Sequence, residues 1–340
     1  MIDVLVVGGG PVGLVAAIHA ARQGLEVTVV EPRTSPVDKA CGEGLMPDAL
    51  SRLRRIGVDP PGMPIRGIRY RDGRREAVAH FSGEPGRGVR RTALHAALAE
   101  RVRDLGIAVV AATAGDVVCG PGRVEAAGIT ARYLIGADGL HSAVRRALGL
   151  VARPAGRRRR FGVRQHFDAA AWTDLVEVHW LSDAEVYVTP VDEHVVGVAV
   201  LGEPPLDLPA AIARVPELAE RLADARPVSV PRGAGPLRQR SSARRVDRAL
   251  LVGDAAGYVD ALTGEGLRVG FAEAEAAVGA IVAGAPELYE RQWRSITRSY
   301  RWLTTGLVWT TSRRWLRPTV VPAAHWQPAV FARIVDRLAY

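Results

Sequence analysis

Residues 2–31 read IDVLVVGGGPVGLVAAIHAARQGLEVTVVE, and this stretch decides how the first part of the chain folds. Ile2 to Val7 is a short apolar run of the kind that forms a buried parallel strand. A helix is expected from about Val12 to Gln23, between this strand and a second apolar run that ends at Glu31. The order strand, glycine turn, helix and strand predicts a βαβ unit that binds a nucleotide pyrophosphate.

Three glycines follow the first strand in the spacing G-x-G-x-x-G. Gly8 allows the tight turn, Gly10 lets the backbone approach the pyrophosphate, and Gly13 lets the helix pack closely on the strand. The start of the helix directs free N–H groups and a positive dipole end at the phosphate. Glu31 stands where a carboxylate accepts hydrogen bonds from a ribose diol. The cofactor-binding residues expected here are Gly8, Gly10, Pro11, Val12, Gly13, Glu31 and Arg33.

A second glycine-rich turn lies far along the chain, in the stretch ALLVGDAAGYVDALTGEGLRVGF that begins at residue 249. A strand runs into Gly253 and Asp254, and the Asp254 carboxylate can meet a ribityl or ribose hydroxyl. Backbone N–H groups at a helix start near Gly264 and Gly266 suit the negative charge of a reduced isoalloxazine. An ordinary strand–loop–helix turn is the alternative interpretation. Together the two turns favour FAD over NAD, and the residues expected to hold it here are Gly253, Asp254, Gly264, Gly266 and Leu267.

With these motifs in order, the chain resembles the flavoprotein superfamily of p-hydroxybenzoate hydroxylase and geranylgeranyl reductase. The likeness rests on GGGPVG with Glu31, on IGADGLHSAVRR (residues 135–146) and on GDAAGYVDALTGEG, and it covers Met1 to about residue 285. The resemblance implies that Asp138 and Gly139 lie near the cofactor pyrophosphate and the path of the nicotinamide. It also implies that Asp254 holds the ribityl chain and that Arg91, in VRRTALHAAL, contacts the flavin.

One segment is more specific to a branch of this superfamily. The stretch CGEGLMPDAL, from Cys41 to Leu50, resembles the cysteine-glycine loop of the geranylgeranyl reductases. That branch usually carries Trp-x-Phe-Pro on its substrate sheet, whereas this chain has Tyr187-Val188-Thr189-Pro190, which disfavours a long isoprenoid substrate. Cys41 either approaches the flavin or is a small residue in a tight loop. Glu43 is a further candidate for a buried hydrogen-bonding acid.

Composition narrows the class of protein. The formal net charge is +9, but Lys39 is the only lysine among 45 basic residues, which indicates a GC-rich coding sequence rather than a nucleic-acid-binding face. Cys41 and Cys119 offer neither a disulfide framework nor a metal site, so a reducing cytoplasm is expected. Met1 leads directly into the first strand, which predicts no signal peptide, and no apolar run is long enough to span a membrane.

The order of elements predicts an α/β protein with an interrupted Rossmann-like FAD-binding domain, an antiparallel-sheet substrate domain and a C-terminal helical segment. From Phe161 to Leu201 the pattern is one of strands without intervening helices, and Asp72-Gly73 marks a hairpin turn. The predicted boundaries are 1–66, 84–155 and 240–284 for the FAD domain, 67–83 and 156–239 for the substrate domain, and 285–340 for the helical segment.

Two basic segments allow more than one interpretation. Arg157 to Arg160 is expected to be a solvated surface turn, or else to meet the phosphate of a reduced nucleotide. In the last fifty residues, apolar side chains recur at helical spacing with arginines on another face. This helix is expected to pack on the parent domain, and contact with a membrane surface is the alternative. The recurring residues are Trp293, Ile296, Tyr300, Leu303 and Leu307.

We find no Ser/His/Asp triad and no metal-binding cluster in the sequence, and a flavin needs neither, because it supplies the chemistry itself. His166 and His179 lie on the predicted sheet, and each is either a structural histidine or an acid–base group. The leading hypothesis is an FAD-dependent monooxygenase that hydroxylates or epoxidises a small apolar or aromatic molecule with O2. Because there is only one dinucleotide fingerprint, NAD(P)H must visit transiently or a partner flavin reductase must supply the electrons.

Two alternatives stay open. One is an ene-reductase or dehydrogenase of the geranylgeranyl reductase kind, and the other is a non-redox scaffold or cyclase that holds FAD structurally. Flavin halogenases share the architecture but use a catalytic lysine and a Trp-x-Trp-x-Ile-Pro segment. This chain lacks that segment and has only Lys39, so halogenation is disfavoured.

Overall fold

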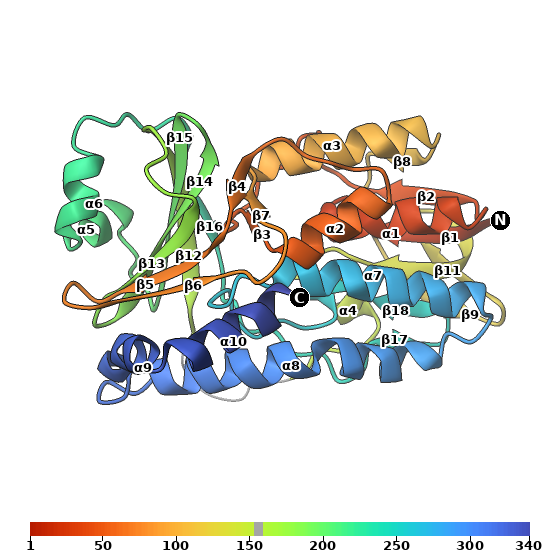
Figure 1. Ribbon diagram of the computed structural model, residues 1–340. Coiled ribbons are helices and arrows are strands. Elements are labelled where there is room, and N and C mark those ends of the chain that lie inside the picture. Colours follow the sequence, from red (N-terminus) through yellow and green to blue (C-terminus); the bar gives the residue numbers. More distant parts are fainter. Residues whose placement is uncertain (153–158) are drawn as a thin grey trace.

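A computed structural model describes residues 1–152 and 159–340 of the chain (Figure 1). Its cofactor half is built on a mainly parallel sheet with the strand order β17-β18-β11-β1-β2-β8. The first strand, β1, lies between β11 and β2 and is parallel to both, as the βαβ pattern predicts. The strands are β1 (Ile2–Val7), β2 (Val27–Val30), β8 (Ala108–Val110), β11 (Ile129–Gly136), β17 (Arg245–Val246) and β18 (Ala249–Leu251).

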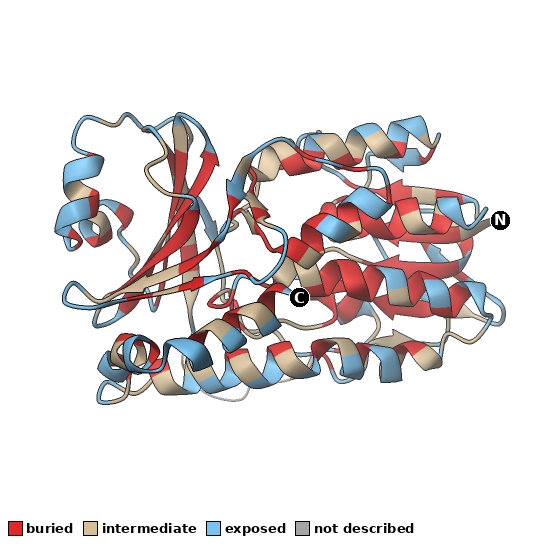
Figure 2. Cartoon of the chain, viewed as in Figure 1, coloured by how far each residue is buried: buried red, intermediate tan, exposed pale blue. Residues whose placement is uncertain are grey.

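Helices cover both faces of this sheet, and the core between them is apolar. Val4, Leu5 and Val6 of β1 are fully buried, which explains the unbroken apolar run at the start of the chain. Figure 2 shows the same burial along the sheet and along the inner faces of its helices. The helices of this half are α1 (Pro11–Arg22), α2 (Pro47–Arg55), α3 (Arg91–Asp104), α4 (Ala143–Ala147) and α7 (Gly266–Val282).

The second half is a sheet of seven strands in the order β16-β12-β15-β14-β13-β5-β6. Its strands are antiparallel except where β13 runs parallel to β5. The hairpin expected at Asp72-Gly73 is the β5–β6 connection, so this hairpin crosses from the first half of the sequence into the second sheet. The strands are β5 (Gly67–Arg71), β6 (Glu76–His80), β12 (Phe161–Asp168), β13 (Leu175–Trp180), β14 (Ala184–Asp192), β15 (Val195–Gly202) and β16 (Arg232–Ala234).

Each face of the second sheet packs on a different set of helices. Val186 and Val198 belong to the core beneath α5 (Leu208–Ala213) and α6 (Pro216–Arg221). Val178 of β13 instead shares a core with the C-terminal helices. Those helices run along one side of both halves in Figure 1 and are α8 (Leu288–Thr311), α9 (Val320–Trp326) and α10 (Pro328–Ala339), with a short turn η2 (Arg317–Thr319) before α9.

The five residues that recur at helical spacing near the C-terminus differ in burial. Trp293 and Tyr300 are buried, and the other three predicted residues are half-buried, so packing on the parent domain is confirmed for the inner face of α8. The outer face of α8 carries exposed side chains. None of the helices described is long and apolar enough to cross a membrane.

The predicted fold class is confirmed, and two features of it are new. A three-stranded sheet of β3 (Gly44–Leu45), β4 (Met63–Ile65) and β7 (Gly86–Gly88) lies between the two halves. A hairpin of β9 (Val118–Gly120) and β10 (Arg123–Ala126) extends the parallel sheet in antiparallel fashion.

One expectation needs correction. In the segment predicted as a solvated turn, Arg157 and Arg158 lie outside the described residues, and Arg159 is exposed. Arg160 is instead largely buried, because its guanidinium pairs with the carboxylates of Glu185 at 2.6 Å and Asp260 at 3.0 Å.

Candidate cofactor and substrate site

The first glycine turn leaves open space where a phosphate is expected. A Cβ on Gly13 would overlap the carbonyl oxygen of Gly8, and a Cβ on Gly8 would clash with the backbone of Ala137. These two glycines are therefore required for close packing. A Cβ on Gly10 would meet only Arg91 Nη2, at 3.9 Å, so the space beside the N-terminus of α1 is free. A pyrophosphate can approach the backbone there.

The acid at the end of β2 is held ready for hydrogen bonding. Glu31 Oε2 accepts a hydrogen bond from the Gly9 N–H at 2.9 Å, and both of its oxygens accept from the Arg33 guanidinium. Burial raises the pKa of Glu31, but the hydrogen bonds from Arg33 outweigh burial. The pKa of Glu31 is therefore below its usual range. The carboxylate therefore stays ionised, as an acceptor for ribose hydroxyls must.

The structure brings the two distant glycine turns into contact. Gly253 has a φ of +61°, and a Cβ there would lie 3.2 Å from Val12 Cγ1, on the first turn of α1. A Cβ on Gly270 of α7 would clash with the same valine. Asp254, next to Gly253, is therefore close to the start of α1. One extended dinucleotide can contact both turns.

A buried arginine braces the second turn. Arg145 Nη1 donates to the carbonyl oxygens of Asp254 at 3.1 Å and Ala255 at 2.9 Å. Its Nη2 donates to the carbonyl oxygen of Leu140 at 2.7 Å. This side chain joins the Asp138-Gly139 segment to the Asp254 segment. No local sequence pattern predicts this role of Arg145, because its pairing with Asp254 spans 109 residues of sequence.

The Asp138-Gly139 turn has a free acceptor. Asp138 Oδ2 accepts from the N–H groups of Ala143 at 2.6 Å and Val144 at 3.1 Å, at the start of α4, while its Oδ1 is buried and has no partner among the described residues. Lys39 Nζ lies 3.6 Å from Asp254 Oδ2 and would lie 3.1 Å from a Cβ on Gly139. No motif in the sequence marks Lys39 as a cofactor residue, although its ammonium lies between two predicted cofactor contacts.

Two cavities meet at Asp138 and Lys39. The larger has a volume of about 1470 Å³ and the smaller about 710 Å³. The smaller is lined by Gly8, Glu31 and Thr113, as expected for the adenosine end of a dinucleotide. The larger contains the turns at Gly10, Asp254 and Gly264. The residues that line both are Arg33, Lys39, Asp138, Leu140, Gly162, Val163 and Ala234.

The free space at Gly10, the unpartnered Asp138 oxygen and the joined cavities fit an extended FAD. The other predicted cofactor residues are placed consistently with this fit. Arg91 lines the larger cavity beside Gly10, and Pro11, Val12, Gly139, Gly253, Gly266 and Leu267 line it as well.

The larger cavity continues into an apolar chamber away from the glycine turns. Strands β5 and β13 form one wall, and helices α8, α9 and α10 form the other. The volume exceeds the 300–1,000 Å³ typical of a small-molecule site, so there is room beyond a cofactor. The apolar wall residues are Ile68, Val176, Val178, Leu262, Leu307, Val320, Phe331 and Val335.

Glu43 proves to be a buried acid, one of the alternatives that the sequence left open. It has a φ of +61° in the loop that follows Cys41. Its carboxylate accepts from the Arg91 N–H at 2.8 Å, lies 2.6 Å from His166 Nε2 and 3.6 Å from Arg164 Nη2. This cluster links the cofactor half to β12 of the second sheet.

Neither candidate histidine lines either described cavity. His166 is buried between Glu43 and Ser229, whose Oγ lies 2.9 Å from Nδ1, so both ring nitrogens have partners. His179 is buried 3.6 Å from Glu177. Burial raises the pKa of Glu177, but the nearby His179 ring and a hydrogen bond from Trp172 Nε1 outweigh this effect and bring the pKa to about 2.

Cys41, in contrast, lines the larger cavity, and its Sγ accepts a hydrogen bond from the Glu43 N–H at 3.3 Å. Of the three candidate catalytic residues, it is the one whose side chain can reach a bound molecule.

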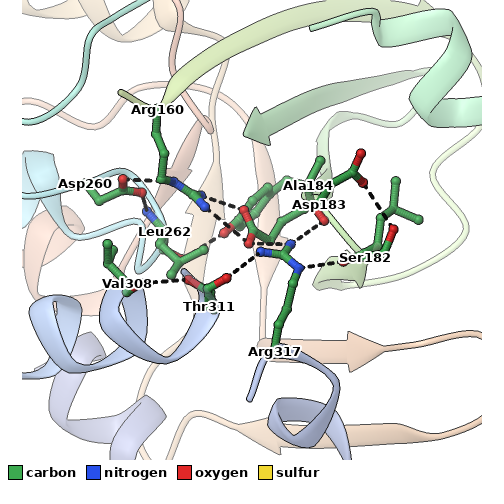
Figure 3. A network of polar contacts seen from close by, with 12 residues as sticks. Arg160, Ser182, Asp183, Ala184, Asp260, Leu262, Val308, Thr311 and Arg317 are labelled. Atoms are coloured by element: carbon green, nitrogen blue, oxygen red, sulfur yellow. Dashed lines mark hydrogen bonds and ion pairs between the residues drawn. The ribbon is translucent and has the colours of Figure 1, made fainter. Parts of the chain in front are cut away.

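A second buried network joins the second sheet to the turn between α8 and α9 (Figure 3). Arg160 and Arg317 both pair with the Glu185 carboxylate, at 2.6 and 2.7 Å, from opposite sides. Asp260 pairs with Arg160, and its burial raises its pKa to about 6 against the opposing effect of this arginine. Sequence reasoning did not find this network, since its members lie on four separate segments.

A family model described as "FAD binding domain" matches residues 1–283 of this chain. Among curated relatives, "Menaquinone reductase" of Mycolicibacterium smegmatis is 54% identical over 56 residues, which span 16% of this chain and 14% of that protein. "3-(3-hydroxy-phenyl)propionate/3-hydroxycinnamic acid hydroxylase" of Mycobacterium avium is 33% identical over 179 residues, 44% of this chain and 31% of that protein. These matches therefore span only small parts of the relatives.

A longer match covers most of both chains. "Digeranylgeranylglycerophospholipid reductase 2" of Methanopyrus kandleri is 31% identical over 305 residues, 78% of this chain and 73% of that protein. Among solved structures, a flavoprotein/dehydrogenase from Cytophaga hutchinsonii has a TM-score of 0.85 at 22% identity and covers 99% of this chain and 92% of that chain. The p-nitrophenol 4-monooxygenase of Pseudomonas putida has a TM-score of 0.78 at 18% identity, and the match covers 99% of this chain and 95% of that chain.

The structural matches show the shared fold, and the family model and the longest sequence match agree with the geometry of the two glycine turns. This chain is therefore a member of the FAD-binding oxidoreductase family that includes monooxygenases, halogenases and reductases.

Proposed function

We propose that this protein is an FAD-dependent monooxygenase that hydroxylates or epoxidises an apolar molecule bound in the chamber beside α8, α9 and α10. The observation that carries the proposal is the continuity of the dinucleotide cavity with a chamber whose walls are apolar. Bound FAD would supply the redox chemistry, with electrons from NAD(P)H and oxygen from O2. The chamber would exclude water from the reacting atoms.

The residues of the two turns would hold the cofactor. The N-terminus of α1 at Gly10 would bind the pyrophosphate, Glu31 the adenosine ribose, and Asp254 the ribityl chain. The Lys39 ammonium lies 3.6 Å from Asp254 Oδ2, where it would also meet an anionic group of the cofactor. The helix start at Gly266 lines the larger cavity, where N–H groups favour negative charge.

The source of electrons belongs to the same proposal. The smaller cavity extends past Asp138 to His141 and Gly235, so it opens beside the expected pyrophosphate. NAD(P)H would visit the protein transiently, or a separate flavin reductase would deliver reduced flavin. Both routes leave the apolar chamber free for substrate.

A reductase of the geranylgeranyl reductase kind is the second candidate, and one observation favours it. Cys41 lines the cavity and carries a thiol, which is a proton donor of the kind that saturation of a double bond requires. Two relatives are named as reductases: one is aligned over 78% of this chain, and the other is 54% identical over 56 residues. Two hydrogens would then reach the substrate, and no oxygen would be consumed.

One set of assays separates these candidates. Purified yellow holoprotein is mixed with NADPH and, in turn, with 3-(3-hydroxyphenyl)propionate, menaquinone-4 and geranylgeraniol, in air containing ¹⁸O2 and under argon. The monooxygenase proposal expects a product that carries one ¹⁸O atom, and no product under argon. A product that has gained two hydrogens under argon would replace it with the reductase.

Further outcomes of these assays are informative. Turnover that persists without NADPH and without O2 would overturn both candidates in favour of the non-redox scaffold or cyclase. Matched reactions that contain chloride and bromide test halogenation, which the missing Trp-x-Trp-x-Ile-Pro segment disfavours. NADPH oxidation that accelerates only when a substrate is present would support transient visits of the nicotinamide to this chain. Oxidation that requires an added flavin reductase would support the partner route.

A further inference from the structure

We propose that the outer face of the C-terminal helices docks on an anionic lipid surface, with the mouth of the apolar chamber facing the lipid. This proposal does not depend on which reaction the flavin performs. It concerns residues 291–335, which include most of α8, all of α9 and the first part of α10. We call the exposed side chains of this stretch the lipid-facing surface.

Tryptophan exposure is concentrated on this surface. The chain has seven tryptophans, and Trp302, Trp309, Trp315 and Trp326 are 76%, 52%, 73% and 70% exposed. The other three are buried or half-buried. An exposed indole is costly in water, whereas it is favourable at the boundary between headgroups and acyl chains. Four exposed tryptophans within 25 residues form a cluster, whereas surface apolar side chains are normally scattered singly. Such a cluster indicates a surface that binds a partner.

The charge of the surface identifies that occupant. Residues 291–335 contain eight arginines and no aspartate or glutamate, and seven of these arginines are exposed or half-buried, whereas Arg317 is buried. Arg298 and Arg314 are exposed, and they lie four residues before Trp302 and directly before Trp315. Arg313 stacks on the Trp309 ring, with its guanidinium carbon 3.6 Å from the ring centroid. A surface with this combination matches an anionic lipid headgroup layer, to which each arginine contributes attraction.

The same surface surrounds the opening of the chamber. Trp302 and Trp309 on α8 and Val330 and Ile334 on α10 are all exposed, and all four line the larger cavity. Arg337 of α10 donates to Ser299 of α8 at 3.0 Å, so these two helices are held together at the mouth. An apolar molecule can thus pass from lipid into the chamber without crossing water.

The surface is anchored to the rest of the protein by the network of Figure 3. Arg317, at the corner between α8 and α9, donates to the carbonyl oxygens of Leu181 and Ala184 and pairs with Glu185, all within 2.7 Å. This corner is therefore fixed to the second sheet. A docked surface would keep the chamber mouth in a constant position relative to the lipid.

A second copy of the chain is a poor match for this surface, because two faces without acidic residues would repel each other. An acidic partner protein would satisfy the arginines but would leave the apolar mouth without a lipid to draw from. We therefore commit to the lipid, and the other partners become outcomes of the test.

The test is vesicle flotation of the yellow holoprotein at low salt. Vesicles of phosphatidylcholine alone are compared with vesicles of equal parts phosphatidylcholine and phosphatidylglycerol. Three variants are compared with the natural chain: Trp302→Ser/Trp309→Ser, Arg298→Gln/Arg314→Gln, and the control Arg103→Gln/Arg123→Gln. The control makes the same charge change at exposed arginines of α3 and β10. Bound flavin and the melting temperature are recorded for each variant to establish that it is folded.

We expect binding to the phosphatidylglycerol vesicles that weakens as salt is added, and little binding to phosphatidylcholine alone. The Arg298/Arg314 variant should bind about 30-fold more weakly, which corresponds to ~1 kcal/mol for each arginine near an anionic surface. The tryptophan variant should also lose binding, and the control should keep it. The proposal is overturned if the natural chain does not float, if either test variant floats as well as the control, or if size-exclusion shows a dimer that the tryptophan variant dissociates.

Discussion

Gly10 shows at the scale of one residue how the backbone makes room for a cofactor. Its Cα faces free space beside the N-terminus of α1, whereas Gly8 and Gly13 face neighbouring backbone. The three glycines of one motif therefore have two different functions. Those at the ends permit packing, and the middle one leaves the space in which we propose that the pyrophosphate binds.

Replacing Gly10 by leucine should leave the fold intact and remove the cofactor. The leucine side chain would occupy the expected pyrophosphate space, at a cost of about 1–3 kcal/mol, or roughly a 10- to 100-fold loss of FAD affinity. The ratio of flavin to protein absorbance and titration with FAD measure this loss. Gly279→Leu is the matched control, because Gly279 lies in α7 with no heavy atom within 4 Å of its Cβ position. Stoichiometric flavin in the Gly10 variant would contradict the placement of the pyrophosphate.

Glu43 is the residue whose removal should be most disruptive outside the glycine turns. Without the Glu43 carboxylate, Arg164 keeps one of its two acid partners, Asp38. The Arg91 N–H loses its acceptor, and His166 Nε2 loses its carboxylate partner. Breaking a buried ion pair in this way costs about 3–5 kcal/mol.

Urea denaturation of Glu43→Ala measures that cost. Glu125→Ala is the comparison, since Glu125 is exposed on β10. Equal stability of the two variants would mean that the Glu43 cluster contributes nothing to joining the two halves.

At the scale of elements, helix α7 carries a buried acid against the second glycine turn. Glu273 Oε2 accepts the Gly253 N–H at 2.6 Å, and burial raises the pKa of this carboxyl to about 8. An unfolded glutamate releases its proton near a pH of about 4.3. Between these values the folded protein holds a proton that the unfolded chain has lost, so stability falls as the pH rises toward 8.

Glu273→Gln should therefore lose less stability than the natural chain between about pH 5 and pH 9, because a neutral amide oxygen still accepts the Gly253 hydrogen bond. Melting temperatures across that range measure the difference. Glu275→Gln is the control on the same helix, where the side chain is half exposed and pairs with Arg52. Parallel pH profiles for the natural chain and Glu273→Gln would show that this proton does not contribute.

Long periodic segments of the fold could be predicted from the sequence, and short ones could not. Hydrophobic periodicity marks helices α1 and α7 and strands β12 to β15. These elements lie within a few residues of where the sequence predicts them. Strands β3, β4 and β7 have only two or three residues each, so no periodicity marks them. They form only because the two halves meet there.

The site divides in the same way. The glycine turns and their acids are local signals, and we could place them from spacing alone. The contact of His166 with Glu43 joins residues 123 apart, and that of Arg317 with Glu185 joins residues 132 apart. No local pattern encodes such pairs, which is why Arg160 was placed on the surface and the histidines stayed undecided.

At the scale of the whole molecule, the C-terminal helices depend on Arg317 for their attachment to the second sheet. Arg317→Met keeps much of the side-chain volume but loses the hydrogen bonds to Leu181, Ala184 and Glu185. Glu185 keeps Arg160 as a partner, so we expect a loss of about 1–3 kcal/mol rather than complete unfolding.

Hydrogen exchange measured by mass spectrometry is the appropriate readout for Arg317→Met. Amides of α8 and α9 should exchange faster, while those of β1 and α1 should be unchanged. Arg333→Met, at an exposed position of α10, serves as the comparison. Equal protection of α8 in both variants would contradict an anchoring role for Arg317.

The order of strands in the cofactor sheet has a consequence for synthesis on the ribosome. Strand β1 lies at the centre, but its neighbour β11 and the next strand, β18, are translated more than a hundred residues later. Nascent chains grow N-terminus first, so the phosphate turn emerges long before Asp254 can close over the other end of the cofactor. A stalled or prematurely terminated product that lacks β18 should therefore be colourless, and flavin capture can serve as a marker of completed translation.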